Sequence, residues 1–208
     1  VADAEKALTF YHDVLGMDLP PLPANAPPVV VPRPYLTTQE IQNLYDAPGV
    51  PYRVTVGMIA ESPMRAENVE WNAGDRKPIR PRLQDPGAGV MVMQVRDLDG
   101  IMARVRQAKA SVVTAGGAPM SVAGREGRSR RVMLQDPDGF FVELVQPEAL
   151  PAGSAQASNN IFNIGFAVTV ADMGRMMEVF KAMGFEPVLG EWTRDPAQAR
   201  IAGVAATT

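Results

Sequence analysis

The stretch that decides the fold is Asp136-Pro137-Asp138-Gly139-Phe140-Phe141-Val142-Glu143-Leu144. Proline at the second position of its first four residues and glycine at the fourth suit a type I turn. The residues on either side, 130–135 and 140–145, carry the apolar side chains typical of strands. The stretch therefore predicts a β-hairpin.

A second pattern, a Val-x-Asp triplet followed by helical spacing of apolar residues, occurs three times. The aspartates are Asp3, Asp97 and Asp172, each placed to accept a backbone N–H at the start of a helix. Gly16 and Gly184 stop the first and third helices. The apolar stripes, typical of helices that pack one face on a core, are Ala4, Ala7, Leu8, Tyr11, Val14 and Leu15; Leu98, Ile101, Met102, Val105 and Ala108; and Met173, Met176, Met177 and Phe180.

Stretches typical of strands surround the three helices. The sequence predicts strands at 89–95 and 161–170 before the second and third helices, at 52–60 and 68–72 after the first, and at 111–114, 130–135 and 140–145 after the second. The repeating unit is thus a strand, a helix and a further set of strands.

The spacing of these units predicts the domain organisation. We expect two units over 1–149, with the opening strand of the first unit missing, and the start of an incomplete third unit over 159–208. Residues 150–158 are small, polar and proline-containing, as expected of a linker. The proline-rich segment 20–34 is expected to be an extended surface loop.

Two motifs resemble the vicinal oxygen chelate superfamily of glyoxalases, bleomycin resistance proteins and extradiol dioxygenases. Asp3 with Phe10-Tyr11-His12-Asp13-Val14-Leu15-Gly16-Met17 is similar to its first-helix signature, and the 136–144 stretch is similar to its closing hairpin. The resemblance implies an α+β fold of tandem βαβββ modules paired into a cupped mixed sheet. The order of motifs is also similar to a branch with four modules per chain.

The resemblance also implies where metal ligands would lie. The family typically uses a histidine on the first strand and a glutamate on the last strand of each module. Glu70 and Glu143 stand at the last-strand positions of the first and second modules, so the resemblance implies that they are metal ligands. The second-module histidine position holds Val90, and the third holds Gly165, with Asn163 as a possible substitute. His12 lies on a helix instead, so a divalent metal is not supported by the histidine positions.

Three roles remain open for Glu70 and Glu143. They could help to hold a hard cation such as Mg²⁺ or Mn²⁺, although two ligands bind such ions weakly. Without metal, a buried carboxylate with a raised pKa could act as a general base, and Glu143 is the candidate catalytic residue. Alternatively, each pairs with an arginine on a neighbouring strand. The expected pocket wall is Val90, Val92, Gln94, Arg53 and Arg131.

Composition narrows the function further. None of the 208 residues is a cysteine, which excludes thiolate metal sites, cysteine nucleophiles and disulfides. The single histidine excludes any site that needs two histidines from one chain. With 20 basic and 23 acidic residues, the net charge of −3 disfavours nucleic acid or anionic lipid as partners. No run reaches the ~18 apolar residues of a spanning helix. We expect a homodimer, with a cytoplasmic location as the default; an exported form stays open.

These observations leave three functions. The first is a small-molecule-binding protein that holds its ligand in the cup between paired modules, with a degenerate metal site. The second is a metal-dependent lyase, isomerase or ring-cleaving dioxygenase. The third is a structural half of a four-module protein whose active site lies elsewhere. Substitution of Val90 for the family's histidine favours the first and third.

Overall fold

The computed structural model describes residues 1–26, 30–59, 64–77, 79–124, 127–150, 159–186 and 196–203. Apart from residue 150, the predicted linker lies outside these ranges. In chain order the elements are α1 (Ala4–Leu8), the π-helix η1 (Thr9–Val14), α2 (Gln39–Leu44), β1 (Tyr52–Met58), β2 (Arg65–Trp71), β3 (Gly89–Val95), α3 (Leu98–Gln107), β4 (Ser111–Val112), β5 (Met120–Gly124), β6 (Gly127–Gln135), β7 (Phe141–Pro147), β8 (Ile161–Val168), α4 (Met173–Ala182) and α5 (Pro196–Ile201).

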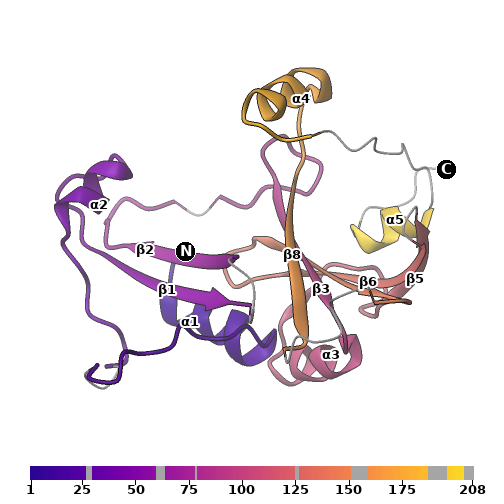
Figure 1. The fold of residues 1–208 in the computed structure, drawn as a ribbon, viewed down its shortest axis with the longest axis horizontal. Helices are drawn as coiled ribbons and strands as arrows, with labels where there is room; N and C mark the ends of the chain where they lie inside the picture. Colours follow the sequence, from indigo (N-terminus) through magenta and orange to yellow (C-terminus); the bar gives the residue numbers. More distant parts are fainter. Residues whose placement is uncertain are drawn as a thin grey trace.

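The strands form two sheets, which Figure 1 shows on either side of the molecule. Strands β1 and β2 pair antiparallel in one sheet. The other has the order β4-β6-β7-β3-β8, with β5 paired to β6. Strand β3 is parallel to β7, and every other pairing is antiparallel. The unit from β3 to β7 is therefore a βαβββ-like module in a mixed sheet, which confirms the predicted α+β class.

Strand β8 is the neighbour of β3, a pairing that sequence analysis did not predict. The expected partner of the second module was the first, yet the first contributes only its separate β1–β2 sheet. The antiparallel ladder runs from Gly89 opposite Val168 to Val95 opposite Ile161. The strand expected to open a third unit thus lies in the same sheet as the strands expected for the second.

The three predicted helix starts are confirmed by their capping hydrogen bonds. The Asp3 carboxylate accepts from the backbone N–H groups of Glu5 and Lys6. Asp97 accepts from Gly100, and Asp172 from Arg175. The predicted turn of the hairpin is confirmed as well, since the Gly139 N–H donates to the Asp136 carbonyl at 3.0 Å.

The main core lies between the helices α1, η1 and α3 and one face of the large sheet. Phe10 and Leu15 of the first helical segment pack with Ile101 and Met102 of α3 and with Leu144 of β7, all 4% exposed or less. Below the sheets in Figure 1, the helical segment of α1 and η1 extends toward α3, and η1 contacts α3. These helices therefore cover one face of the large sheet and do not contact its opposite face.

The opposite face of the large sheet carries a smaller apolar cluster. Ile201 of α5 packs there with Val90, Val122, Met133 and Phe141. Figure 1 shows α5 against β5 and β6. None of the helices in the described ranges is long and apolar enough to span a membrane.

Candidate functional site

The strand register places most of the predicted wall residues on one face of the large sheet. Met133, Glu143, Val92 and Gly165 lie opposite one another across β6, β7, β3 and β8. Because successive side chains alternate between faces, Val90 and Gln94 join Val92 on β3, and Arg131 joins Met133 on β6. This face, called here the Glu143 face, is turned away from α3. It comprises Val90, Val92, Gln94, Arg131, Met133, Phe141 and Glu143.

Glu143 and Arg131 form the one charged pair on the Glu143 face. Arg131 Nη1 lies 3.4 Å from Glu143 Oε1, and Arg131 Nε donates to Ser129 Oγ at 2.8 Å. The glutamate side chain is 14% exposed and the arginine 29%. Within the described ranges, Arg131 is the sole polar partner of the Glu143 carboxyl. Burial raises the pKa of Glu143 above its ordinary value, and the charge of Arg131 offsets this only in part.

The surroundings of this pair are apolar at one end and open at the other. Ile201 covers the part of the face near Phe141 and Met133. Toward β8, Val92 and Gln94 are half-buried, and Gly165 is exposed. An apolar wall with a few convergent polar groups is the usual composition of a small-molecule site. The geometry thus places one arginine and one carboxyl on a largely apolar face that is less buried on its β8 side.

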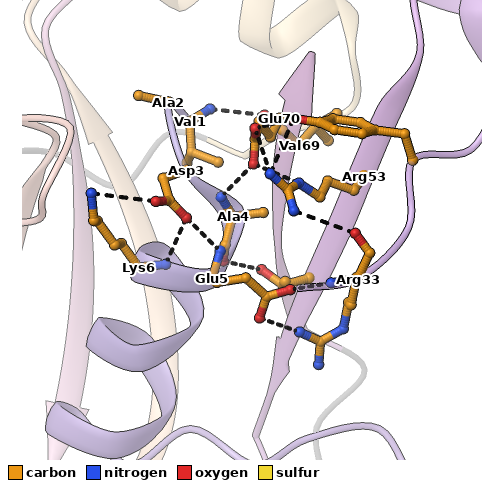
Figure 2. A network of polar contacts seen from close by, with 12 residues as sticks. Val1, Ala2, Asp3, Ala4, Glu5, Lys6, Arg33, Arg53, Val69 and Glu70 are labelled. Carbon is orange, nitrogen blue, oxygen red and sulfur yellow. Dashed lines mark hydrogen bonds and ion pairs between the residues drawn. The ribbon is translucent and has the colours of Figure 1, made fainter. Parts of the chain in front are cut away.

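Glu70 lies in a different environment, shown in Figure 2. Its Oε2 accepts from the Ala4 N–H and from Arg53 Nε, both at 2.9 Å. Its Oε1 accepts from Tyr35 Oη at 2.6 Å and from Arg53 Nη2 at 3.0 Å. Burial would raise the pKa of Glu70, but the hydrogen bonds from Arg53, Tyr35 and Ala4 lower it to about 2. The carboxylate is therefore held in its ionised form, and each of its oxygens accepts two hydrogen bonds.

The structure does not bring Glu70 and Glu143 together. Glu70 points from β2 toward the start of α1, whereas Glu143 points away from α3. By alternation along β2, the face away from α1 carries Arg65, Glu67, Val69 and Trp71, so its carboxylate is the exposed Glu67. Arg53 accordingly lies opposite Glu70 on β1 and does not belong to the Glu143 face.

The residues present do not fit the metal that the resemblance implies. The four donors to Glu70 leave its oxygens no lone pair for an ion. Val90, where the resemblance implies a histidine, packs in an apolar cluster. The described residues hold no group of three or more histidine, cysteine or acidic side chains placed to bind a metal. A catalytic metal normally has three protein ligands.

His12, the single histidine, lies away from the Glu143 face. Its Nδ1 donates to the Met17 carbonyl at 2.6 Å, and its ring is 41% exposed. This contact ties the end of η1 to the following residues. The histidine thus has a local structural contact on the helix side of the fold.

A cavity of about 430 Å³ lies between β2 and the second module. Glu67 and Asn68 line it from β2, Met91 from β3, and Asp138 and Phe140 from the hairpin turn. The buried atoms Asn68 Nδ2 and Asp138 Oδ2 have no hydrogen-bond partner among the described residues. Sequence reasoning missed this cavity because its residues come from separate segments with no shared spacing.

Comparison with solved structures identifies the fold. A glyoxalase family protein from Bacillus cereus superimposes with a TM-score of 0.50 at 15% identity, over 70% of this chain and 87% of that chain. A protein named provisionally as a dioxygenase from Bacillus subtilis subsp. subtilis str. 168 gives a TM-score of 0.54 at 18% identity, over 92% of this chain. The match spans 55% of that protein's length.

A third match is TnmS3, an antibiotic binding protein from Streptomyces sp. CB03234. It superimposes with a TM-score of 0.40 at 22% identity, over 71% of this chain and 89% of that chain. No family model and no curated protein matches the sequence. The two matches with TM-scores of 0.50 and 0.54 show that the chain has the fold of these glyoxalase and dioxygenase proteins, and its chemistry rests on its own residues.

Proposed function

We propose that the chain binds a small molecule on the Glu143 face of the large sheet, without a metal. The observation that carries the proposal is the loosely joined pair of Arg131 and Glu143 in apolar surroundings. Their closest contact is 3.4 Å, longer than a good charge-assisted hydrogen bond of about 2.8 Å. A ligand that inserts its polar end between the two groups would improve the hydrogen bonding of both.

The two side chains define the ligand's polar end. Arg131 Nη2 donates to no described residue, so it can bind a carbonyl or hydroxyl oxygen. Burial raises the pKa of Glu143 and so favours its protonated form over that of an exposed carboxyl; protonated, the group can donate a hydrogen bond as well as accept one. The body of the ligand would lie along Val92 and the exposed Gly165. A small oxygenated molecule with an apolar portion fits these contacts.

A second candidate function is proton transfer by Glu143. A carboxyl with a raised pKa beside a fixed cation is a recurrent form of general base. In this role Glu143 would take a proton from a carbon or hydroxyl of the bound molecule, and Arg131 would stabilise the resulting oxyanion. Substrate turnover that is lost in Glu143→Gln, with ligand binding retained, would distinguish catalysis from binding alone.

Titration with phenylacetamide tests the binding proposal, because its amide can accept from Arg131 and donate to Glu143. We expect backbone amide NMR shifts concentrated at Val92, Gln94 and their neighbours. Arg131→Ala should weaken binding by about tenfold, the usual effect of losing one charge-assisted hydrogen bond. The matched control is Arg130→Ala, because Arg130 is the adjacent residue, points to the opposite face and pairs with Asp99 at 2.7 Å.

Equal affinity in the Arg131→Ala and Arg130→Ala proteins would contradict the proposal. Shifts that cluster away from β3 and β7 would do the same. Binding that needs added Mn²⁺ or Zn²⁺ would instead support the metal-dependent alternative.

The proposal extends to assembly and organisation. We propose a homodimer, supported by the large exposed apolar side chains Phe166, Met173, Met183 and Phe185 on and around β8 and α4. Light scattering that gives a mass of 22.4 kDa would contradict it.

We also propose units at 1–149 and 159–208 joined at 150–158, with a cytoplasmic location. Limited proteolysis should cut first within 150–158.

A further inference from the structure

A second cavity, of about 470 Å³, lies on the helix side of the fold. Its walls come from α1 and η1, from the turn between α3 and β4, and from the hairpin turn at 136–139. It contains neither Arg131 nor Glu143, and its volume is in the range of small-molecule sites. Whatever it binds is therefore independent of the proposed function above.

Basic side chains from three separate segments line this cavity: Lys6 of α1, Arg80 of the segment before β3, and Lys109 after α3. Within the described ranges, neither Arg80 nor Lys109 forms an ion pair. Lys6 contacts Asp3 at 3.3 Å on the surface, a pair that is mostly exposed and weak. In a chain of net charge −3, this convergence creates a local positive potential.

The single acidic residue of the lining, Asp136, is already engaged. Its Oδ1 accepts from the N–H groups of Asp138 and Phe140 at 2.9 and 2.8 Å, and its Oδ2 accepts from Tyr11 Oη at 3.1 Å. These donors satisfy the carboxylate within the hairpin turn. Arg80 and Lys109, which form no ion pair within the described ranges, therefore leave the cavity positive, and Lys6 adds to this through a weak surface pair.

The remaining walls supply neutral donors and apolar surface. Thr9, Ser111 and Gln135 line the cavity with two hydroxyls and an amide, and Phe10 and Val14 present apolar atoms from η1. A hydrated inorganic anion would not use the apolar part. A molecule with one anionic group and a flat apolar body would use both.

The backbone at Lys109 gives an independent reason to assign its side chain a role. Lys109 has φ of +53°, the left-handed conformation at the end of a helix that favours glycine. Lysine is disfavoured in this conformation, so its presence is explained if the ammonium group is needed in the cavity.

We infer that this cavity is a binding site for small organic anions that carry a carboxylate on an apolar, ring-sized body. Lys109, Arg80 and Lys6 bind the carboxylate, and Phe10 and Val14 contact the body. The site should prefer an anion, because a neutral ligand of the same shape would leave the three cations without a counter-charge and bind more weakly.

Isothermal titration of the full chain with naphthalene-2-carboxylate and with the neutral naphthalene-2-carboxamide tests the inference. We expect saturable binding of the carboxylate and at least about tenfold weaker binding of the carboxamide, the effect of losing one charge-assisted contact. Affinity for the carboxylate should fall as KCl is raised. Equal binding of the two compounds, or no saturable binding of the carboxylate in the millimolar range, overturns the inference.

Lys109→Gly is the decisive variant, because glycine removes the side chain and suits the left-handed backbone. We expect carboxylate affinity to fall about threefold or more, with a midpoint of thermal unfolding no lower than that of the parent. Arg80→Ala should also weaken binding. Lys181→Ala, which removes an equal charge from α4 outside the cavity, should bind as the parent does. Unchanged affinity in both Lys109→Gly and Arg80→Ala overturns the inference.

Discussion

Arg53 and Glu70 face each other across β1 and β2 as a two-point ion pair, with Nε to Oε2 at 2.9 Å and Nη2 to Oε1 at 3.0 Å. The glutamate side chain is 4% exposed and the arginine 14%. The same carboxylate accepts the Ala4 N–H at the start of α1. One side chain thereby joins the small sheet to the first helix, and Figure 2 shows this junction.

Glu70→Gln should destabilise the fold by about 2 kcal/mol, because it leaves a largely buried guanidinium without its counter-charge. Urea unfolding followed by tryptophan fluorescence measures this, since Trp71 is the next residue of β2. The control is Asp85→Asn, which removes an exposed i,i+3 pair with Arg82 and should cost much less. Equal losses in the two variants would contradict a special role for Glu70.

The same contact predicts an acid limb of stability. The pKa of Glu70 is about 2 in the folded chain against an ordinary 4.5, so the folded state binds fewer protons than the unfolded state between these values. Its contribution is complete above pH 4.5 and is lost as pH falls toward 2. The Glu70→Gln protein should show a flatter decline in unfolding free energy over this range. Parallel curves for parent and variant would refute the assignment.

Local sequence signals predicted much of the fold. The aspartate caps, the Gly89–Val95 strand and the turn at Asp136–Gly139 depend on residues close in sequence, and each is found as expected. Strand β5 was missed because its residues Met120–Gly124 are weak strand formers, and pairing to β6 decides their conformation. Helix α5 is too short for a periodic signal, and Ile201 anchors it in the core.

The candidate site was predictable only where side-chain alternation along one strand decides it. Val90, Val92 and Gln94 share a face because they alternate along β3, and that part needs no tertiary information. Glu67 and Glu70 point to opposite faces of β2, so which of them faces α1 depends on how β2 packs against that helix. The hydrogen bond from the Val1 N-terminus to the Val69 carbonyl at 2.8 Å and the contact with Ala4 fix that seating. Neither contact has a sequence signature.

Glu143→Gln should stabilise the chain at neutral pH. Burial raises the pKa of Glu143, so the folded state binds more protons than the unfolded state at pH values between the two pKa values. Stability is therefore lost as pH rises through the pKa of the folded state. The neutral amide avoids that loss while keeping the shape of the side chain. Thermal unfolding at pH 5 and pH 8 should show a larger gain for the variant at the higher pH. A variant less stable than the parent at pH 8 would show that the Arg131 pair outweighs burial.

Tyr11→Phe should destabilise the fold by about 1 to 2 kcal/mol, because the Asp136 Oδ2 loses its donor in a buried position. Burial and the Asp136 charge raise the pKa of Tyr11, so the hydroxyl stays protonated and donates throughout the working pH range. Tyr45→Phe is the matched control, because Tyr45 is 50% exposed and contacts Trp71 through its ring. Similar denaturation midpoints for both variants would contradict a structural role for the Tyr11 hydroxyl.

Addition of Zn²⁺ or Mn²⁺ should leave the thermal midpoint unchanged. A ligand that binds the folded state raises stability by RT ln(1 + [L]/Kd), so a real site would show a saturable rise. Here both Glu70 oxygens already accept two hydrogen bonds, and the position expected for a histidine holds Val90 in apolar contacts. Val90→His offers the gain-of-function comparison, since it places an imidazole on the same face as Glu143. A saturable, chelator-reversible rise in the parent protein would overturn the metal-free proposal, whereas a rise confined to the variant would show that the missing imidazole is what excludes the metal.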